Sequence, residues 1–179
     1  MLDKDNVILL VIDVQEKLFR VMAEKETLAA NLLKLVRGCR IMGVPVMVTE
    51  QNPTGIGPTL PDLKAALTGS PIFAKHAFSC CAEDEFMQML RSFGRRQVII
   101  AGLEAHICVH QTAAGLLQLG YNVHMATDCV SSRSPENKNL ALRRLEQDGA
   151  KLTGVEMALF EMLKTSACSE FEAISTLIK

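Results

Sequence analysis

Short apolar runs rich in β-branched residues alternate with helical patterns along the whole chain, and this alternation constrains the fold more than any other feature. It predicts strands at about residues 6–13, 44–49, 71–75, 97–102, 121–126 and 150–153. It predicts helices at 27–42, 83–93, 106–119, 136–148, 154–163 and 169–178. Such alternation builds a parallel sheet with helices on both faces. The expected fold is therefore α/β, a three-layer α/β/α sandwich around a six-stranded, mostly parallel, doubly wound sheet of Rossmann-like type.

The longest stretch without either pattern is the segment 50–62, EQNPTGIGPTLPD, which is rich in Pro and Gly. It follows the second predicted strand, and we expect it to form an irregular loop. Loops in that position of a doubly wound sheet border ligand sites.

Length and composition limit the partners that this chain can have. Its 179 residues fit a single domain spanning 1–179. Hydrophobic residues make up 49% and aromatic residues 4%, so we expect an aliphatic core and an apolar excess that covers the interface of a homo-oligomer. Lys and Arg total 19 and Asp and Glu total 20, scattered along the chain. This balance provides no attraction for nucleic acid or an anionic membrane, and leaves a small molecule as the expected partner.

The N-terminal segment and the cysteines both indicate the cytoplasm. The segment MLDKDNVILLVIDVQ meets acidic residues at once and runs into a strand pattern, unlike a secretion signal. No apolar stretch is long enough to span a membrane. The six cysteines lack the spacing of a disulfide or zinc framework, so most of them are expected to be small buried residues in a reducing compartment.

Three chemically matched residues fall at the ends of three predicted strands. Asp13 ends the first, Lys75 ends the third, and Cys108 opens the helix after the fourth. The carboxyl ends of parallel strands share one edge of the sheet, where ligands bind. A thiol at a helix start, near an ammonium, is expected to favour the thiolate, and Asp13 could take and return its proton. The sequence therefore predicts an activated nucleophile at this edge.

Each of these residues also has a plainer explanation. An Asp at a strand end can cap the following helix, a strand-end Lys can be solvated, and a Cys can be a packed small residue. The conjunction of all three at one edge favours the functional interpretation, because three independent placements there are much less probable by chance than any one of them.

Three segments carry a resemblance to a known family. The stretches LLVIDVQEKLF, AKHAFSCCAEDEF and AGLEAHICVHQTAAGLLQLGYNVHMATDCVSSRS resemble the motif blocks of the isochorismatase-like cysteine hydrolase superfamily, over about residues 5–160. The resemblance implies a catalytic triad of Asp13, Lys75 and Cys108, a six-stranded parallel sheet, and oligomers that help to close the active site.

The resemblance also implies how the reacting carbonyl would be held. In this superfamily a non-proline cis peptide precedes the nucleophile, and by position it would join Leu103 to Glu104. The backbone amides of Glu104 and Cys108 would then form the oxyanion hole, which typically contributes about 3 kcal/mol to transition-state stabilisation. We further expect Gln15, Phe19 and Gln51 to bind substrate.

Departures from the superfamily narrow the chemistry. Its nicotinamidases bind a metal through His residues after the second strand, where this chain has TEQN at 49–52. His106 and His110 are four apart, but the Glu of a metalloprotease motif is missing. We therefore expect no metal and no cofactor. Cys108 argues against isochorismate cleavage, because members with that activity generally do not depend on a Cys. The loop and the FSCC stretch instead resemble the superfamily's small hydrolases of undefined substrate.

The function that follows is a cysteine hydrolase acting on a small amide-like or related carbon–nitrogen substrate. One alternative is a non-catalytic oligomeric binding or assembly module with a vestigial pocket. Another is a redox protein in which Cys108 is reversibly oxidised, with Cys80, Cys81 or Cys129 as the resolving thiol.

Overall fold

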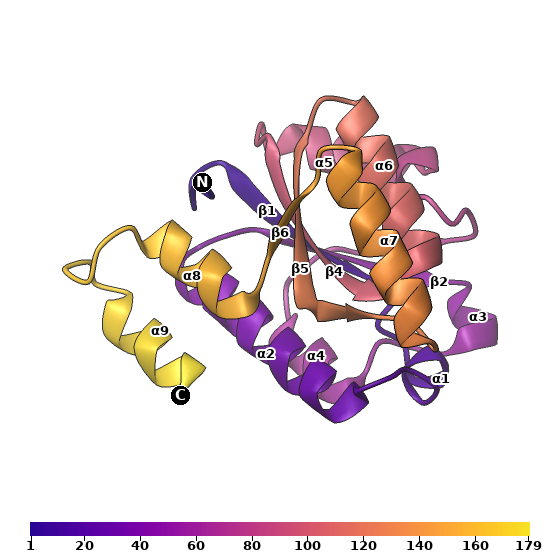
Figure 1. Ribbon diagram of the computed structural model, residues 1–179, viewed down its shortest axis with the longest axis horizontal. Coiled ribbons are helices and arrows are strands. Elements are labelled where there is room, and N and C mark those ends of the chain that lie inside the picture. The colour runs from indigo at the N-terminus through magenta and orange to yellow at the C-terminus, as the bar shows by residue number, and fades with distance from the viewer.

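A computed structural model describes residues 1–179, and its centre is one six-stranded sheet (Figure 1). The strands are β1 (Val7–Ile12), β2 (Val46–Gln51), β3 (Ile72–Lys75), β4 (Gln97–Leu103), β5 (Asn122–Ser131) and β6 (Lys151–Thr153). All neighbours pair in parallel, in the order β3-β2-β1-β4-β5-β6. The predicted fold class is confirmed. Successive strands are added on one side of β1 up to β3 and on its other side from β4 onward, so the strand order reverses between β1 and β4.

Helices cover both faces of the sheet. They are α1 (Glu16–Phe19), α2 (Lys25–Ile41), α3 (Pro53–Ile56), α4 (Pro61–Ala66), α5 (Asp84–Ser92), α6 (His110–Gln118), α7 (Pro135–Gln147), α8 (Val155–Leu163) and α9 (Phe171–Ile178). Helices α2, α4, α8 and α9 pack on one face, and α5, α6 and α7 on the other (Figure 1).

The run VILLVI of β1 shows why the strands read as continuous apolar segments. Val7, Leu9 and Val11 face the cluster under α2 and α8, whereas their alternate neighbours face the cluster under α5, α6 and α7. All six residues are fully buried. A strand covered on both faces has no solvent side that would call for polar residues.

The segment 50–62 is more ordered than the irregular loop that we predicted, and that prediction was wrong in part. Strand β2 continues through Gln51, and two short helices, α3 and α4, follow it. Each has a proline in its first turn, where the missing N–H would have no partner and the fixed φ suits a helix.

Gly102 allows β4 to pass close to β1 at the point where the strand order reverses. A Cβ atom built on Gly102 would lie 2.2 Å from the Ile12 carbonyl oxygen, and the residue has a φ of +148°. The pairing of β4 with β5 also shifts register between Ile100 and Gly102. The local backbone at this end of β4 therefore requires glycine.

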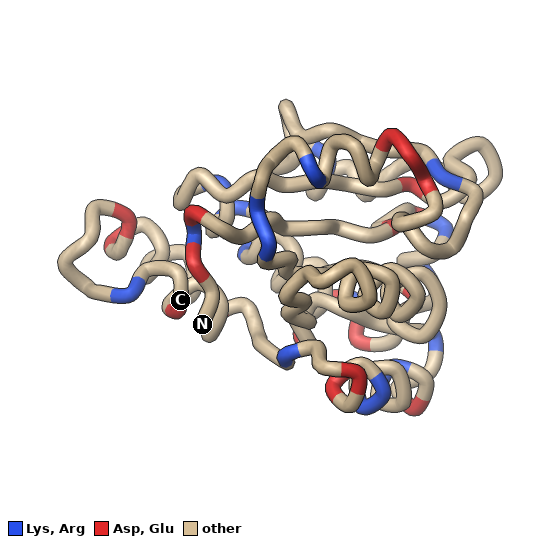
Figure 2. Tube along the Cα trace, turned by 90° about the horizontal axis from the view of Figure 1, so that it is seen from above, with Lys and Arg blue, Asp and Glu red and all other residues tan.

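Charged residues of both signs are interspersed along the chain, as the backbone trace in Figure 2 shows. No helix combines the length and apolar character needed to cross a bilayer.

Candidate active site

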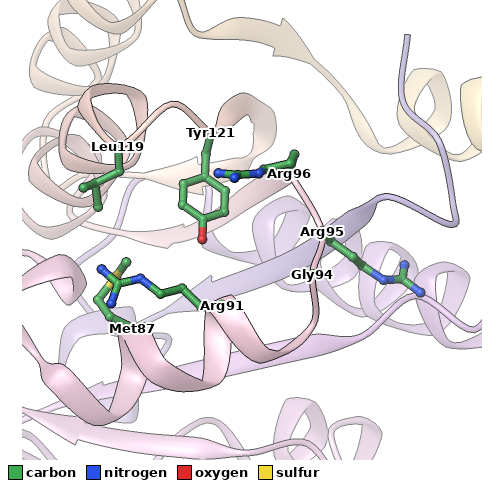
Figure 3. Close-up of a pocket in the computed structure, with 7 residues that line it drawn as sticks. All are labelled: Met87, Arg91, Gly94, Arg95, Arg96, Leu119 and Tyr121. Carbon is green, nitrogen blue, oxygen red and sulfur yellow. The ribbon is translucent and has the colours of Figure 1, made fainter.

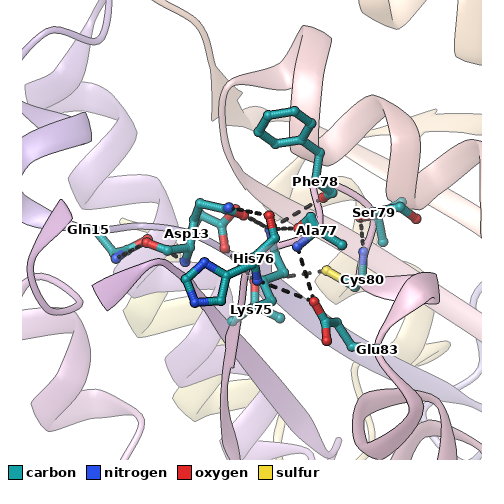
Figure 4. Close-up of polar contacts among 12 residues, drawn as sticks. Asp13, Gln15, Lys75, His76, Ala77, Phe78, Ser79, Cys80 and Glu83 are labelled. Carbon is teal, nitrogen blue, oxygen red and sulfur yellow. Dashed lines mark hydrogen bonds and ion pairs between the residues drawn. The ribbon is translucent and has the colours of Figure 1, made fainter. Parts of the chain in front are cut away.

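Asp13 and Lys75 form a buried ion pair at the carboxyl edge of the sheet (Figure 4). The Lys75 Nζ lies 2.8 Å from Asp13 Oδ2, and each side chain is 1% exposed. Strand β2 lies between the two strands that carry them, so the pair spans three neighbouring strands. The sequence prediction that these residues lie together at the sheet edge agrees with this geometry.

The Lys75 ammonium has other acceptors besides the Asp13 carboxylate. It donates to Gln51 Oε1 at 2.6 Å and contacts the carbonyl oxygens of Ala77 and Phe78 at 3.2 and 3.3 Å. Burial lowers the pKa of Lys75, but the charge and hydrogen bond of Asp13 outweigh it and leave the pKa raised. Lys75 is therefore held as a charged, fully engaged ammonium.

Thr49 holds the other oxygen of the Asp13 carboxylate. Its Oγ1 donates to Asp13 Oδ1 at 2.7 Å, and its backbone carbonyl accepts from the Asp13 N–H at 3.1 Å. Both residues are fully buried. The sequence analysis assigned no such role to Thr49, and the signal that could have found it is register: Thr49 pairs with Ile12, the residue before Asp13.

Cys108 lies in a π-helical turn, η2 (Ala105–Val109), between β4 and α6. The thiol is 6% exposed. Burial, with a smaller contribution from the Asp13 carboxylate, raises the pKa of Cys108 to about 12, even though the Lys75 ammonium acts to lower it. The expectation of a resting thiolate was wrong, because loss of solvation and the nearby carboxylate outweigh the ammonium.

A second thiol, Cys80, lies against the same network. Its Sγ is 4.0 Å from Thr49 Oγ1, and its backbone N–H donates to Thr112 Oγ1 at 3.0 Å. Cys80 is fully buried, and burial raises its pKa to about 12. All six cysteines are free, so this one is a neutral neighbour of the Lys75 ammonium.

The peptide bond between Leu103 and Glu104 is trans, because the chain contains no cis peptide bond. That part of the prediction was wrong. The chain makes the turn into η2 through Glu104 itself, which adopts a left-handed conformation with φ 55° and ψ 62°. The Glu104 carboxylate binds Arg133 Nε at 2.7 Å through Oε1. The oxyanion role of the Glu104 and Cys108 amides stays a prediction.

The three residues expected to bind substrate have different environments. The Gln15 amide nitrogen donates to the carbonyls of Gln51 and Gly57, and its oxygen accepts from the Gln51 N–H. Gln15 is fully buried, so its polar atoms hold the loop after β2 and are not free for a ligand. The Gln51 side chain joins Lys75 to the His76 carbonyl. Phe19 packs against the core.

The site is closed to solvent. Asp13, Lys75 and Cys108 are 0%, 2% and 6% exposed, respectively. The five main surface cavities are lined by other residues. The segment 76–79 contributes the carbonyls that face Lys75.

His106 and His110 do not come together as metal ligands. His106 Nδ1 lies 3.0 Å from Ser132 Oγ and 3.3 Å from Glu104 Oε2, whereas His110 Nε2 is buried without a partner. No group of three or more ligating side chains suited to a metal ion occurs.

Several proteins of known name or structure resemble this chain. Isochorismatase domain-containing protein 2 of Danio rerio is 37% identical over 172 residues, covering 96% of this chain and 86% of the relative. The structure of MAR1 ribonuclease from Caenorhabditis elegans has a TM-score of 0.94 and 36% identity, covering 99% of this chain and 91% of the other.

Two further neighbours are YcaC proteins at 25% identity. The Escherichia coli protein, described as an octameric hydrolase of unknown specificity, has a TM-score of 0.94 and covers 99% of this chain and 88% of its own. The Pseudomonas aeruginosa structure contains hexane-2,5-diol and covalent acrylamide. It has a TM-score of 0.93, and the match covers 98% of this chain and 90% of the other.

The family profile of the isochorismatase domain matches residues 7–157 of the chain, from the first residue of β1 into α8. This span includes all six strands, Asp13, Lys75 and Cys108. The chain therefore belongs to the isochorismatase-like hydrolase superfamily.

Proposed function

We propose that the protein is a cofactor-independent cysteine hydrolase acting on a small amide-like or related carbon–nitrogen substrate. The observation that carries this proposal is the Asp13 carboxylate. One oxygen is bound by Lys75 and the other by Thr49, and the Cys108 thiol lies close enough for the carboxylate charge to raise its pKa. A fixed base beside a buried nucleophile is the arrangement that covalent catalysis needs.

The raised pKa of Cys108 determines when its proton moves. The thiol is protonated at rest, so Asp13 would accept the proton as the sulfur–carbon bond forms, as a general base. Collapse of the tetrahedral intermediate then breaks the carbon–nitrogen bond, and Asp13 returns the proton to the leaving nitrogen. Water attacks the thioester, Asp13 takes a proton from it, and the sulfur leaves and is reprotonated.

Lys75 would keep Asp13 in position and lower the pKa of Cys108 in part. The backbone amides of Glu104 and Cys108 are the proposed oxyanion donors, since they flank the turn that presents the sulfur. We place Gln15 and Gln51 among the residues that position the site, because their amides are bonded to the loop and to Lys75. Phe19 remains a proposed substrate contact.

Two neighbours support parts of this proposal. The P. aeruginosa YcaC structure contains covalent acrylamide, an electrophile to which thiols add. The E. coli YcaC protein is octameric, which supports a homo-oligomer here, and a partner subunit could complete the entrance to the closed site. We propose a cytoplasmic location on the basis of six free cysteines.

We propose a small molecule as the substrate although three structural neighbours carry ribonuclease in their names. The 19 basic residues do not outnumber the 20 acidic ones, and residues of both signs are interspersed along the backbone trace (Figure 2). Binding of a nucleic acid backbone requires a concentrated positive surface. A nuclease assay on single-stranded RNA tests this part directly, and turnover that depends on Cys108 would contradict it.

One observation favours the alternative, a non-catalytic assembly module. Asp13, Lys75 and Cys108 are buried and line none of the five main surface cavities. A vestigial site would have this property, and so would an enzyme that opens on binding.

A screen of small amides and carbamoyl compounds distinguishes the two functions. We expect hydrolysis by the parent protein, its loss in Cys108→Ala, and retention in the control Cys81→Ala. Mass spectrometry of the quenched reaction should show an acyl group on the peptide that carries Cys108. Equal turnover by Cys108→Ala and parent protein would refute the mechanism. No turnover of any compound, with no acylation, would favour the assembly module.

A further inference from the structure

A cavity of about 350 Å³ lies at the amino ends of the strands, the end of the sheet opposite to the candidate active site (Figure 3 shows the cavity). It is formed by the end of α5, the segment 94–96 that leads into β4, and the turn between α6 and β5. Because these segments precede β4 and β5, the cavity faces the amino ends of the strands, whereas Asp13 and Lys75 lie at the carboxyl ends.

Two arginines at this cavity have no acceptor. Arg91 and Arg96 are exposed, and neither takes part in any of the chain's ion pairs. Arg95 differs, because its Nη1 donates to the carbonyls of Lys4 and Val7 at 2.6 and 2.9 Å, and it points away from the cavity in Figure 3. No acidic side chain lines the cavity. Arg91 and Arg96 therefore supply uncompensated positive charge.

Tyr121 places a third donor at the same cavity. The residue is 7% exposed, and its hydroxyl makes no side-chain hydrogen bond but is not sealed from the surface. Figure 3 shows the phenol pointing toward the Arg91 side of the cavity, with the Arg96 guanidinium beside the ring. That guanidinium is 5.8 Å from the ring centroid. Because this hydroxyl reaches the surface and has no protein partner, it is available to a ligand.

The remaining wall is apolar. Met87 and Leu119 line it, and the Tyr121 ring adds a flat apolar surface. A bare inorganic ion would use the arginines but not this wall.

We propose that the cavity binds a small organic anion. Its carboxylate or phosphate accepts hydrogen bonds from Arg91, Arg96 and the Tyr121 hydroxyl, and its apolar body packs on Met87 and Leu119. Guanidinium groups bind these anions through paired N–H donors. This site is separate from the candidate active site, and it does not depend on the proposed hydrolase function.

A structural role for the arginines is the competing explanation. Arg91 is in the last turn of α5, where a cation complements the helix dipole. That role requires neither a free tyrosine hydroxyl nor affinity for a ligand, so binding measurements separate the two.

The chain provides its own reporter, because it contains one tyrosine and no tryptophan. Tyr121 fluorescence is recorded while the full-length protein is titrated with cyclohexanecarboxylate or cyclohexyl phosphate, neither of which absorbs with tyrosine. Cyclohexylmethanol, which has the same apolar body without charge, and inorganic phosphate are the matched probes. The variants are Arg91→Gln and Arg96→Gln, with Arg143→Gln, an exposed arginine on α7, as the control.

We expect a saturable fluorescence change with the carboxylate or the phosphate ester. The affinity for that anion should be about tenfold weaker in Arg91→Gln and in Arg96→Gln. Arg143→Gln should bind the anion as the parent protein does. Cyclohexylmethanol and inorganic phosphate should both bind more weakly than the organic anions. Unfolding midpoints of the variants verify that the fold is intact. The proposal is overturned if neither organic anion gives a saturable change, if the alcohol binds as well, or if both cavity variants bind like the parent.

Discussion

The substitution Lys75→Met tests whether the candidate site is built around a buried ion pair. The pair is 2.8 Å long with both side chains 1% exposed. At an effective dielectric constant of about 20, two unit charges at that separation attract by about 6 kcal/mol. The cost of burying both charges offsets much of this attraction, so the pair's net contribution is smaller. Removal of one partner is different, because it leaves the other charge buried without compensation.

In Lys75→Met, Asp13 keeps only the Thr49 hydroxyl as a side-chain hydrogen-bond donor. We therefore expect the free energy of unfolding to fall by about 3–5 kcal/mol. Asp13→Asn should cost less, because the Lys75 ammonium keeps Gln51 Oε1 and two backbone carbonyls as acceptors. The double variant should lose less than the sum of the two single losses.

Urea unfolding of the four proteins, followed by circular dichroism, provides this thermodynamic cycle. Lys4→Met is the control, because the Lys4–Glu170 pair is similar in length at 2.7 Å but more exposed, at 34% and 20% for the two side chains. Its loss should be small beside that of Lys75→Met. A Lys75→Met protein as stable as the parent, or single losses that simply add, would refute the reasoning.

Three further outcomes can be measured on the purified protein. Alkylation of Cys108 by iodoacetamide should be slow at neutral pH and become faster toward pH 12. The variant Asp13→Asn should move this increase to lower pH, because the carboxylate raises the thiol pKa. Mass spectrometry of the modified peptide gives the rates, and an unchanged pH profile in the variant would contradict the coupling. Gly102→Ala should lower the free energy of unfolding, measured in urea, by more than about 4 kcal/mol, or prevent folding. Gly43→Ala is the control and should cost about 1 kcal/mol, because its added Cβ meets no atom within 4 Å but the residue has a φ of +68°. Burial lowers the pKa of His124 from 6.5 to about 4. Between these pH values the folded state binds fewer protons than the unfolded state, so stability should fall as the pH drops from 6.5 toward 4. The variant His124→Gln should flatten this part of the curve of stability against pH, and identical curves for variant and parent would exclude the effect.

The fold could be predicted from sequence because its strongest local signals and its tertiary packing agree. Residues 7–12 are apolar on both faces because helices cover both, and a glycine follows most of the long helices. The segment 50–62 was harder, because its helices are too short to show a period. They are held by contacts distant in sequence, such as the bonds of Gln15 to Gly57 and of Glu50 to Thr59.

The candidate site was predictable where a residue's place at a strand end was enough. Asp13 and Lys75 are such residues. Thr49 was missed because its role follows from the register of β2 against β1, which the sequence does not specify. The pKa direction of Cys108 was missed for a related reason. The local helix start favours a thiolate, but burial by surrounding elements raises the pKa, and burial is a property of the assembled fold.

The contact between Asp13 and Lys75 joins positions 62 residues apart, and the sulfur comes from still later in the chain. During synthesis Asp13 and Lys75 can meet once the first three strands exist, while Cys108 arrives with the segment after the fourth. A nascent or truncated polypeptide without that segment thus lacks the proposed nucleophile, and the proposed chemistry requires the middle of the sheet to be closed.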